Sequence, residues 1–407
     1  CVGFVFMNLR GNNKDSYDIL MKIPFLKINI SKLCLFVNEV IDDTGLNPAK
    51  VPMQIETTLN PDIQDVLNAL NDGSLGYKFV DDKIQVAIVV TDTNNGSILA
   101  VDGRRNQTGE LELNLATDPS ITFQPGSTAK PIFDYGPAIE YLNWNTGTII
   151  ADDRTTYSDG TPIHNWDGGY TGYQTIEQHL KVSRNIPALK TFKAVNKQDI
   201  IKFVTNLGLT PEIYSCDSNY RLSGKKCINK ENANDVVDAK QATTLHEAHA
   251  IGGYNGESPL TMAAAYAAFG NGGYYNEPYS FTKVVHTDTG DTYFNKPARR
   301  QAMSDSTAYM ITHMLQETAA YGIDSGSYKS VNGIRYAAKT GTTNFDEATK
   351  KKNKLPASAI NDYWVIGYNT EYAIGVWYGY DSIKDGYQTL GGSQHQRLFR
   401  SEEHTSE

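Results

Sequence analysis

The order of local patterns along the chain predicts a mixed α/β (α+β) fold. We expect an antiparallel sheet with helices packed against it. Strand-like segments come first, helix-like segments fill the middle, and strand-like segments return at the end. This order is typical of a sheet completed by both ends of one domain. The composition agrees, since 40% hydrophobic and 20% charged residues are ordinary globular values.

Regular patterning begins near Val51, where we place the domain boundary. Residues 1–50 show neither a clean helical nor a clean strand period, and we interpret them as a degraded or truncated linker remnant. The domain is expected over residues 51–399. The last residues, 400–407 (RSEEHTSE), resemble the translation of a sequencing adapter, so we interpret them as a non-native tail; a merely polar tail is the alternative.

The first strands have clear turn and cap signals. Residues 52–58 have a strand pattern, and Asn60-Pro61 supplies a cap and a first-turn proline for a helix. The β-rich runs 84–92 and 97–103 are joined by Asn95-Gly96, which provides the positive φ angles of a tight hairpin. We expect the two runs to pair.

Helical patterns dominate the middle of the chain. Residues 171–206 are predicted to be mainly helical, with a break at Ser183–Asn185 before Ile186-Pro187. That break indicates a loop between helices at the rim of a cleft. Residues 258–273 and 306–322 are further helices, each ended by glycine. Beyond them, three strands are predicted, in the segments 333–343, 361–369 and 372–381.

Charge and cysteine content exclude several classes of function. A net charge of −9 argues against a nucleic-acid partner. No stretch approaches the roughly 20 apolar residues of a membrane-spanning helix, so any signal or anchor is expected upstream of Cys1. The other cysteines are Cys34, Cys216 and Cys227, without a CxxC pair. Cys216 and Cys227 bracket a polar loop and form either a disulfide or two free thiols.

Three short patterns are candidates for chemistry: SxxK at Ser127–Lys130, SxN at Ser183–Asn185 and KTG at Lys339–Gly341. KTG occurs once. The first two patterns have further copies, at Ser223–Lys226, Ser280–Lys283 and Ser330–Asn332. Taken singly they are weak signals, and their order and setting distinguish them.

The setting favours Ser127. It follows Pro125-Gly126 and opens a predicted helix, so Lys130 lies one turn later on the same face. A serine hydroxyl is a poor nucleophile until a base removes its proton. A lysine in a partly dry cleft beside other cations has a lowered pKa and can be that base. Ser223 lies in a polar loop and Ser280 enters a predicted strand, so neither has a helix N-terminus.

The KTG pattern fits a strand edge that lines a cleft. Gly341 permits close approach of a substrate backbone. Lys339 offers a cation for a terminal carboxylate, and Thr340 and Thr342 offer hydroxyls to the same group.

Other residues have simpler explanations. His246 and His249 miss the i, i+4 spacing of a zinc-protease motif, so we expect no metal site and no cofactor. Tyr266 and Phe269 are expected in the core. Trp166 either lines the cleft or has a structural role.

Ordered SxxK, SxN and KTG motifs are the signature of penicillin-binding proteins and serine β-lactamases. The segments FQPGSTAKPI, HNWDGGYTGYQTIEQHLKVSRNIPALK, SPLTMAAAYAAFGNGGYY and AAKTGTTNFD resemble class A penicillin-binding proteins in particular. The resemblance covers roughly residues 50–390. It implies a β-lactamase/transpeptidase-like fold, with an antiparallel five-stranded sheet flanked by helices and a helical subdomain. It also implies a serine-type D-Ala-D-Ala transpeptidase that crosslinks peptidoglycan stem peptides and binds β-lactams covalently.

The same resemblance implies roles for the SxxK and SxN residues. Ser127 would be acylated and Lys130 would be its base. Ser183 would relay a proton to the leaving group, and Asn185 would contact the substrate amide.

For the KTG segment the resemblance implies substrate binding. Lys339, Thr340 and Thr342 would hold the substrate carboxylate beside Gly341. The backbone N–H groups of Ser127 and Thr342 would form the oxyanion hole, worth about 3–4 kcal/mol per donor.

The resemblance also implies a place in the cell and leaves alternatives open. Class A proteins act on the extracytoplasmic face of the bacterial membrane, where an anchor helix and a glycosyltransferase domain precede this domain. Glycosyltransferase motifs are absent here, so no polymerising activity is expected. A DD-carboxypeptidase and a non-catalytic β-lactam sensor or scaffold remain alternatives. A β-lactamase is disfavoured, because no ExxLN-type segment lies between Ser183 and Lys339.

Overall fold

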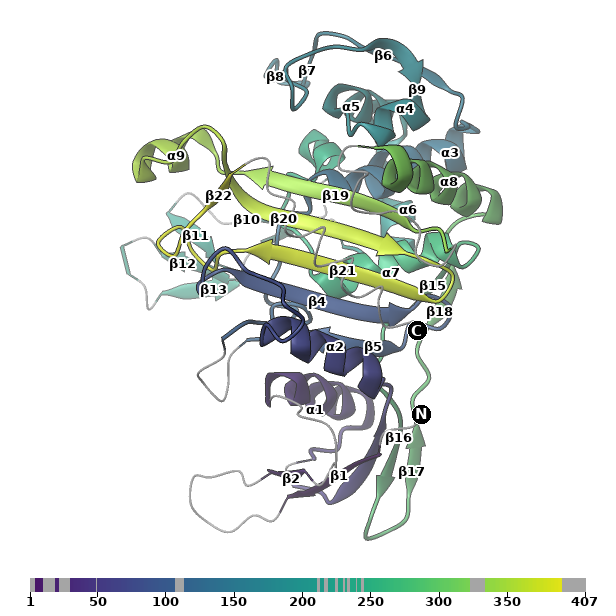
Figure 1. Ribbon diagram of the computed structural model, residues 1–407, viewed down its shortest axis with the longest axis vertical. Helices are drawn as coiled ribbons and strands as arrows, with labels where there is room; N and C mark the ends of the chain where they lie inside the picture. The colour runs from purple at the N-terminus through teal and green to yellow at the C-terminus, as the bar shows by residue number, and fades with distance from the viewer. Residues whose placement is uncertain are drawn as a thin grey trace.

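A central antiparallel sheet crosses the middle of the molecule (Figure 1). The computed structural model describes residues 4–9, 19–21, 30–48, 50–106, 113–210, 213–215, 219–223, 226–229, 231–232, 235–238, 240–242, 245–322 and 334–389. The strands of the sheet follow the order β19 (Ala337–Asn344), β20 (Ala359–Tyr368), β21 (Tyr372–Gly379), β4 (Gln85–Asp92) and β5 (Ile98–Asp102), and a short β22 (Gln388–Thr389) pairs with β20.

Strands from both ends of the domain meet in this sheet. β21 pairs with β4 along its whole length, from Tyr372 opposite Asp92 to Gly379 opposite Gln85. β4 and β5 form the predicted hairpin. The prediction of a five-stranded antiparallel sheet is confirmed, with β22 as an addition that the sequence did not indicate.

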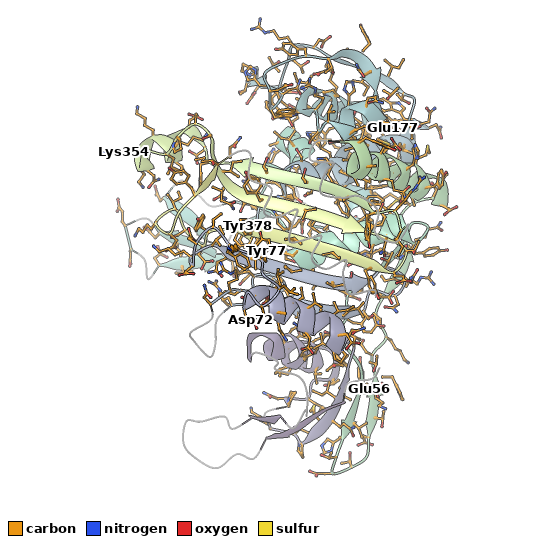
Figure 2. The ribbon with its side chains drawn as sticks, viewed as in Figure 1. Glu56, Asp72, Tyr77, Glu177, Lys354 and Tyr378 are labelled. Atoms are coloured by element: carbon orange, nitrogen blue, oxygen red, sulfur yellow. The ribbon has the colours of Figure 1, made fainter. Side chains whose placement is uncertain are left out.

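Both faces of the sheet are covered, so β4 is buried along almost its entire length. Val86, Ile88 and Val90 pack into the core shared with α2 (Pro61–Asn71). Tyr378 lies in the same core, and Tyr77 packs against it (Figure 2). Ala87 points to the opposite core, which contains α7 (Pro259–Gly270). Full burial of a valine or isoleucine contributes about 1.5–3 kcal/mol. This double cover stabilises the sheet that includes β19, the strand that carries the KTG segment.

A helical lobe lies beyond the β19 edge, at the top of Figure 1. Its helices are α3 (Gly136–Leu142), α4 (Ile176–Lys181), α5 (Asn185–Ala194), α6 (Lys197–Asn206) and α8 (Asp305–Tyr321). Two short antiparallel pairs complete it: β6 (Ile149–Asp152) with β9 (Gly172–Thr175), and β7 (Thr155–Thr156) with β8 (Pro162–Ile163). The predicted helical segment 171–206 is therefore correct except at β9, where pairing with β6 overrides local propensity.

A second sheet lies at the opposite end of the molecule (Figure 1). Its order is β17 (Thr292–Phe294), β16 (Phe281–His286), β3 (Met53–Thr57), β1 (Phe4–Leu9) and β2 (Ile19–Met21). Helix α1 (Ile30–Thr44) contributes Val40 to the core of this sheet. The carboxylate of its Glu39 accepts hydrogen bonds from the N–H and hydroxyl of Ser280.

Here the structure differs from the sequence prediction, which placed no helix or strand before Val51. The elements in this region are held by distant partners: β1 pairs with β3, and α1 contacts β16, far along the chain. A local periodicity search does not detect such contacts. The expected tail at 400–407 lies outside the described residues.

Short hairpins and helices fill the remaining edges. They are β10 (Ile213–Ser215) with β14 (Lys240–Ala242); β11 (Tyr220–Ser223), β12 (Lys226–Asn229) and β13 (Val236–Asp238); β15 (Tyr274–Asn276) with β18 (Arg299–Gln301); and the helices α9 (Glu347–Asn353) and η3 (Glu247–Ile251). Cys227 in β12 is disulfide-bonded, which contradicts the free-thiol alternative for this residue; Cys216 lies outside the described residues. None of the helices within the described ranges has the length and apolarity that a bilayer crossing requires.

The predicted helix start at Asn60 is confirmed, since its side-chain oxygen accepts hydrogen bonds from the N–H groups of Asp62 and Ile63. At the start of α7, Glu257 is buried with Tyr254 and Thr261, whose hydroxyls donate to its carboxyl at 3.2 and 3.0 Å. Burial raises the pKa of Glu257 to about 8.

This raised pKa predicts a pH-dependent stability. Between the ordinary glutamate pKa of 4.5 and about 8, the folded chain keeps a proton that the unfolded chain has lost. Glu257 therefore reduces the free energy of unfolding as pH rises, by up to about 1.4 kcal/mol per pH unit. We expect Glu257→Gln, followed by urea unfolding, to become more stable relative to wild type as pH rises across this window.

Glu56→Gln is the matched control. The pKa of Glu56 is lowered, chiefly by its hydrogen bond with Lys283, so its contribution is constant above the ordinary glutamate pKa. The compared quantity is the difference in free energy of unfolding between each variant and wild type. If this difference is as independent of pH for Glu257→Gln as for Glu56→Gln, the prediction is contradicted.

Candidate active site

Ser127 lies in a short helical turn at the centre of the molecule. The turn η1 (Gly126–Ala129) has 3₁₀ geometry and is followed by a π-helical turn, η2 (Pro131–Tyr135). The sequence predicted a helix here, and the structure differs in its winding. Pro131 has no N–H, so the regular α-helical hydrogen bond cannot form at this position. The Lys130 N–H instead donates to the carbonyl of Ser127, which keeps the two residues one turn apart.

The turn packs against β19 so closely that only glycine fits at the contacts. Gly126 has a φ of 55°, and a Cβ there would lie 2.5 Å from the Thr342 carbonyl oxygen. A Cβ on Gly341 would lie 2.3 Å from the Pro125 oxygen, and one on Gly252 would lie 2.1 Å from the Gly126 oxygen. These backbone contacts bring the SxxK and KTG segments together. They give Gly126 and Gly341 a packing role beside any role in substrate access.

Lys130 is fully buried, and its amine is held by the SxN segment. Nζ donates to the Ser183 carbonyl at 2.7 Å, to Asn185 Oδ1 at 2.9 Å and to Ser183 Oγ at 3.2 Å. Burial and the nearby Lys339 cation place the pKa of Lys130 well below the ordinary lysine range. This environment favours a neutral amine, which has two hydrogens to share among these three acceptors and a lone pair that can accept a proton.

Ser183 joins the two lysines. Its Oγ accepts hydrogen bonds from Nζ of Lys339 at 2.9 Å and from Nζ of Lys130 at 3.2 Å. With both lone pairs engaged, its own hydroxyl hydrogen is left to donate to a third group. Ser183 has a φ of 56°, and this left-handed backbone conformation turns the chain sharply between α4 and α5.

The KTG segment lies on β19, an edge strand of the central sheet. Lys339 is 2% exposed, and its amine also donates to the Thr340 carbonyl at 3.0 Å. Thr340 is half-buried, Gly341 is buried and Thr342 is exposed. The structure therefore places the predicted strand edge beside Ser127 and Ser183.

Asn185 begins α5, and both ends of its amide have protein partners. Oδ1 accepts from Lys130, and Nδ2 donates to the His164 carbonyl at 2.9 Å. The first contact makes Asn185 a support for the lysine. The second uses one of its two N–H groups, so one hydrogen remains for a substrate contact.

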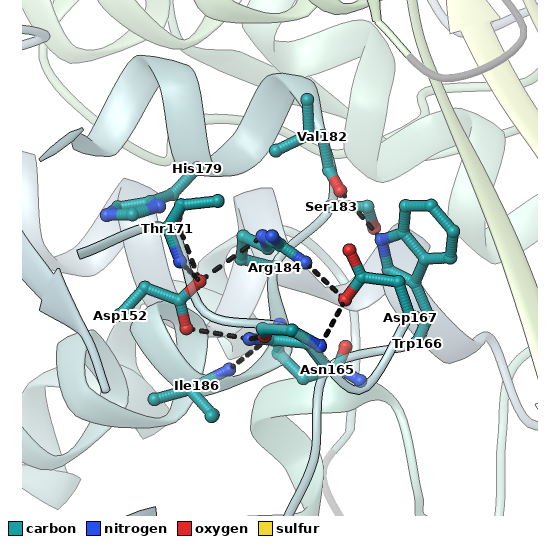
Figure 3. A network of polar contacts seen from close by, with 12 residues as sticks. Asp152, Asn165, Trp166, Asp167, Thr171, His179, Val182, Ser183, Arg184 and Ile186 are labelled. Atoms are coloured by element: carbon teal, nitrogen blue, oxygen red, sulfur yellow. Dashed lines mark hydrogen bonds and ion pairs between the residues drawn. The ribbon is translucent and has the colours of Figure 1, made fainter. Parts of the chain in front are cut away.

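Residues that the sequence did not single out surround this loop (Figure 3). Arg184 lies between the two SxN residues and is paired with Asp152 and Asp167. Asn165 accepts hydrogen bonds from the N–H groups of Asn185 and Ile186. Asn165 and Asp167 belong to the NWDGG segment, from which the sequence analysis named only Trp166, without a decision on its role. Trp166 Nε1 donates to the Val182 carbonyl at 3.1 Å, and its ring is largely exposed.

The other SxxK copies have no comparable setting. Ser223 and Lys226 pair across the β11–β12 hairpin. Ser280 is buried against Glu39, and Lys283 pairs with Glu56. The third repeated motif, at 330–332, falls outside the described residues.

The histidine pair also shows no metal geometry. His249 Nδ1 lies 3.0 Å from both backbone groups of His246. Glu247 accepts hydrogen bonds from Ser158. Across the described ranges, the structure contains no cluster of three or more histidine, cysteine or carboxylate side chains that could hold a metal ion.

Comparison with solved structures defines the class of fold. Two structures of the penicillin-binding protein PonA1 from Mycobacterium tuberculosis, one of them in complex with penicillin V, superpose with a TM-score of 0.71. They share 21% and 22% sequence identity with this chain and match 92% of it, over 90% and 92% of their own chains. The fold is that of penicillin-binding proteins.

The family follows from the sequence. Residues 86–401 match the penicillin binding protein transpeptidase domain, and the chain belongs to this family. It is 37% identical to penicillin-binding protein 1A/1B of Bacillus subtilis over 95% of the chain and 39% of that protein. It is 32% identical to penicillin-binding protein 1A of Streptococcus pneumoniae over 85% of the chain and 45% of that protein. The chain thus spans less than half the length of these relatives.

The close approach at Gly126 predicts a large cost for Gly126→Ala. The positive φ costs an alanine about 1–3 kcal/mol, and the added methyl group would also displace the backbone of Thr342. Gly160→Ala is the matched control, because Gly160 has a φ of 86° and no atom within 4 Å of its Cβ position. We expect urea unfolding to show a clearly larger loss for Gly126→Ala. Equal losses would show that the contact between η1 and β19 contributes nothing to stability.

Proposed function

We propose that this chain catalyses acyl transfer from D-Ala-D-Ala stem peptides of peptidoglycan, with Ser127 as the acylated residue. The observation that supports this most strongly is the hydrogen-bonded array of Lys130, Ser183 and Lys339 beside the turn that carries Ser127. It provides a base, a proton relay and a cation in one place. Membership of the transpeptidase family agrees with this assignment.

Acylation uses the neutral amine of Lys130. Nζ accepts the proton of Ser127 as Oγ attacks the carbonyl carbon of the penultimate D-Ala, and the carbonyl π electrons move to oxygen. The new ammonium donates to Ser183 Oγ, and the Ser183 hydroxyl proton passes to the nitrogen of the departing D-Ala. The C–N bond then breaks, and the electron pair on oxygen re-forms the carbonyl of the ester. Charge and protons balance, because the leaving amine gains the proton that Ser127 lost.

The oxyanion is held by the backbone N–H groups of Ser127 and Thr342. The approach of Gly126 to the Thr342 backbone supports this pairing, because it brings the two segments into contact without an intervening side chain. Each such donor is worth about 2.7–4 kcal/mol in serine hydrolases.

Substrate binding falls to the KTG segment. The substrate carboxylate lies near Lys339, with the hydroxyls of Thr340 and Thr342 as donors. Lys339 then has two tasks, since its ammonium also polarises Ser183. An extended peptide lies along the β19 edge beside Gly341, as peptides do on exposed sheet edges.

The biological setting is crosslinking of the bacterial cell wall on the extracytoplasmic side of the membrane. The partners are glycan-linked stem peptides, and β-lactams are covalent inhibitors; no nucleic acid takes part. The relatives named penicillin-binding protein 1A or 1A/1B support this setting. A carboxypeptidase would use the same acyl-enzyme with water as acceptor, and a sensor or scaffold would bind β-lactams without turnover.

Penicillin labelling tests the nucleophile. We expect intact-mass analysis to show one drug equivalent per chain, and peptide mapping to place it between Gly126 and Lys130. Ser127→Ala should abolish the label. Lys130→Ala should slow labelling by about 10²–10⁴-fold, the usual contribution of a positioned acid–base group. Ser223→Ala and Ser280→Ala are matched controls that keep the label. Survival of the label in folded Ser127→Ala would overturn the assignment.

Turnover of a stem-peptide thioester distinguishes the three activities. A transpeptidase forms an amide product when an amine acceptor is added, and its total turnover rises. A carboxypeptidase releases acid at a rate that the amine does not change. A sensor or scaffold is acylated once and then stops. We expect the first result, and either of the other two would replace transpeptidation as the function.

A further inference from the structure

One short segment is bonded to the SxN loop at every residue, and Figure 3 shows the bonds of Asn165, Trp166 and Asp167. The segment, which we call the splint, comprises residues 164–167, and the loop comprises residues 182–186. His164 O accepts from Asn185 Nδ2, and Asn165 Oδ1 accepts from the N–H groups of Asn185 and Ile186. The indole of Trp166 donates to Val182 O. Asp167 completes the series by accepting from Arg184 at 2.6 Å.

Arg184 is the charged centre of this arrangement. It is 5% exposed; its Nη1 donates a hydrogen bond to Asp167 at 2.6 Å, and its Nε forms an ion pair with Asp152 at 3.2 Å without hydrogen-bond geometry. Asp152 is fully buried and also accepts hydrogen bonds from Asn165 and from Thr171. A planar guanidinium can bind two carboxylates in fixed directions, whereas an ammonium acts as a point charge.

We propose that Arg184, held between Asp152 and Asp167, is a positioning residue for acylation that fixes Ser183 and Asn185 against Lys130. The proposal rests on the proposed function. Arg184 lies between the two residues that bind Lys130, so its anchors on both sides determine where their oxygens point. Ser183 keeps a left-handed backbone, which a residue other than glycine adopts only when its surroundings impose it.

The charge of Arg184 adds an electrostatic effect. Three charged groups act on Lys130: Lys339 from β19, Arg184 from the loop, and Asp134 from its own helix. The two cations lower the pKa of Lys130, whereas Asp134 raises it. Burial raises the pKa of Asp134 well above its ordinary value, so a protonated Asp134 opposes them little. His249 from η3, which lies near Phe133 of the same helix, has a pKa lowered to about 4 and is uncharged at neutral pH.

The test compares two variants of Arg184 in the full chain by the rate of penicillin acylation across pH. Arg184→Gln removes both the planar guanidinium and its positive charge. We expect its rate to fall by about 10²-fold, as small misplacements of catalytic groups do. The rise of its rate with pH should also shift to higher pH, because Lys130 loses a neighbouring cation. Arg184→Lys keeps the positive charge but lacks the planar guanidinium. Its acylation rate should therefore fall, while the pH dependence of that rate stays near wild type.

Arg105→Gln is the matched control, because Arg105 is equally buried but lies on the far side of the central sheet beside Phe79. It should lower thermal stability and leave acylation unchanged. A wild-type rate in folded Arg184→Gln would overturn the proposal. So would equal losses in both Arg184 variants with no shift in pH dependence, since these indicate a merely structural role.

Two further outcomes are decided in the same experiment. If Arg184→Gln does not fold, Asp167→Asn decides: a reduced rate supports the proposal, and an unchanged rate overturns it. Wild-type chain that takes no label on Ser127 contradicts the proposed function itself. Labelled wild type with unaffected variants contradicts the role of Arg184 alone.

Discussion

The whole site depends on one buried amine. Lys130 is fully enclosed, and an amine removed from water needs hydrogen-bond partners and loses its charge readily. Its three acceptors all come from Ser183 and Asn185, so the SxN loop must be held rigidly for the lysine to be tolerated there. The same loop connects Lys130 to Lys339 through a single hydroxyl. The stability of the buried amine and the proposed chemistry therefore both require a rigid SxN loop.

The surrounding structure holds the site rigid from two sides. On the sheet side, β19 belongs to a sheet buried on both faces, and glycine contacts hold the Ser127 turn against it. On the helical side, the splint at 164–167 holds the SxN loop through hydrogen bonds, of which Figure 3 shows those of Trp166 and Asp167. The site thus lies where the sheet and the helical lobe meet. The hydrogen bonds of Ser183 with Lys130 and Lys339 join the two parts.

The sequence predicted the parts of this arrangement that depend on local chemistry. The cap at Asn60, the hairpin at Asn95-Gly96 and the order of the three motifs need only neighbouring residues, and the structure has both elements and brings the motifs together. It did not predict the π-helical turn that begins at Pro131, where the missing N–H removes the regular α-helical hydrogen bond. It also missed the splint and the elements before Val51. The splint lies 16 to 21 residues from its partners, and Glu39 of α1 lies 241 residues from Ser280. A single sequence does not show which of such separated residues meet.

The protonation state of Lys130 tests the central claim most directly. We would follow the ¹³Cε chemical shift of lysine-labelled protein as a function of pH, and assign the Lys130 signal by its loss in Lys130→Arg. The account predicts that this amine titrates well below the ordinary lysine range, because burial and the Lys339 and Arg184 cations disfavour its charge. A Lys130 amine that titrates in the ordinary range would be protonated at neutral pH. That result would contradict its role as the base for Ser127.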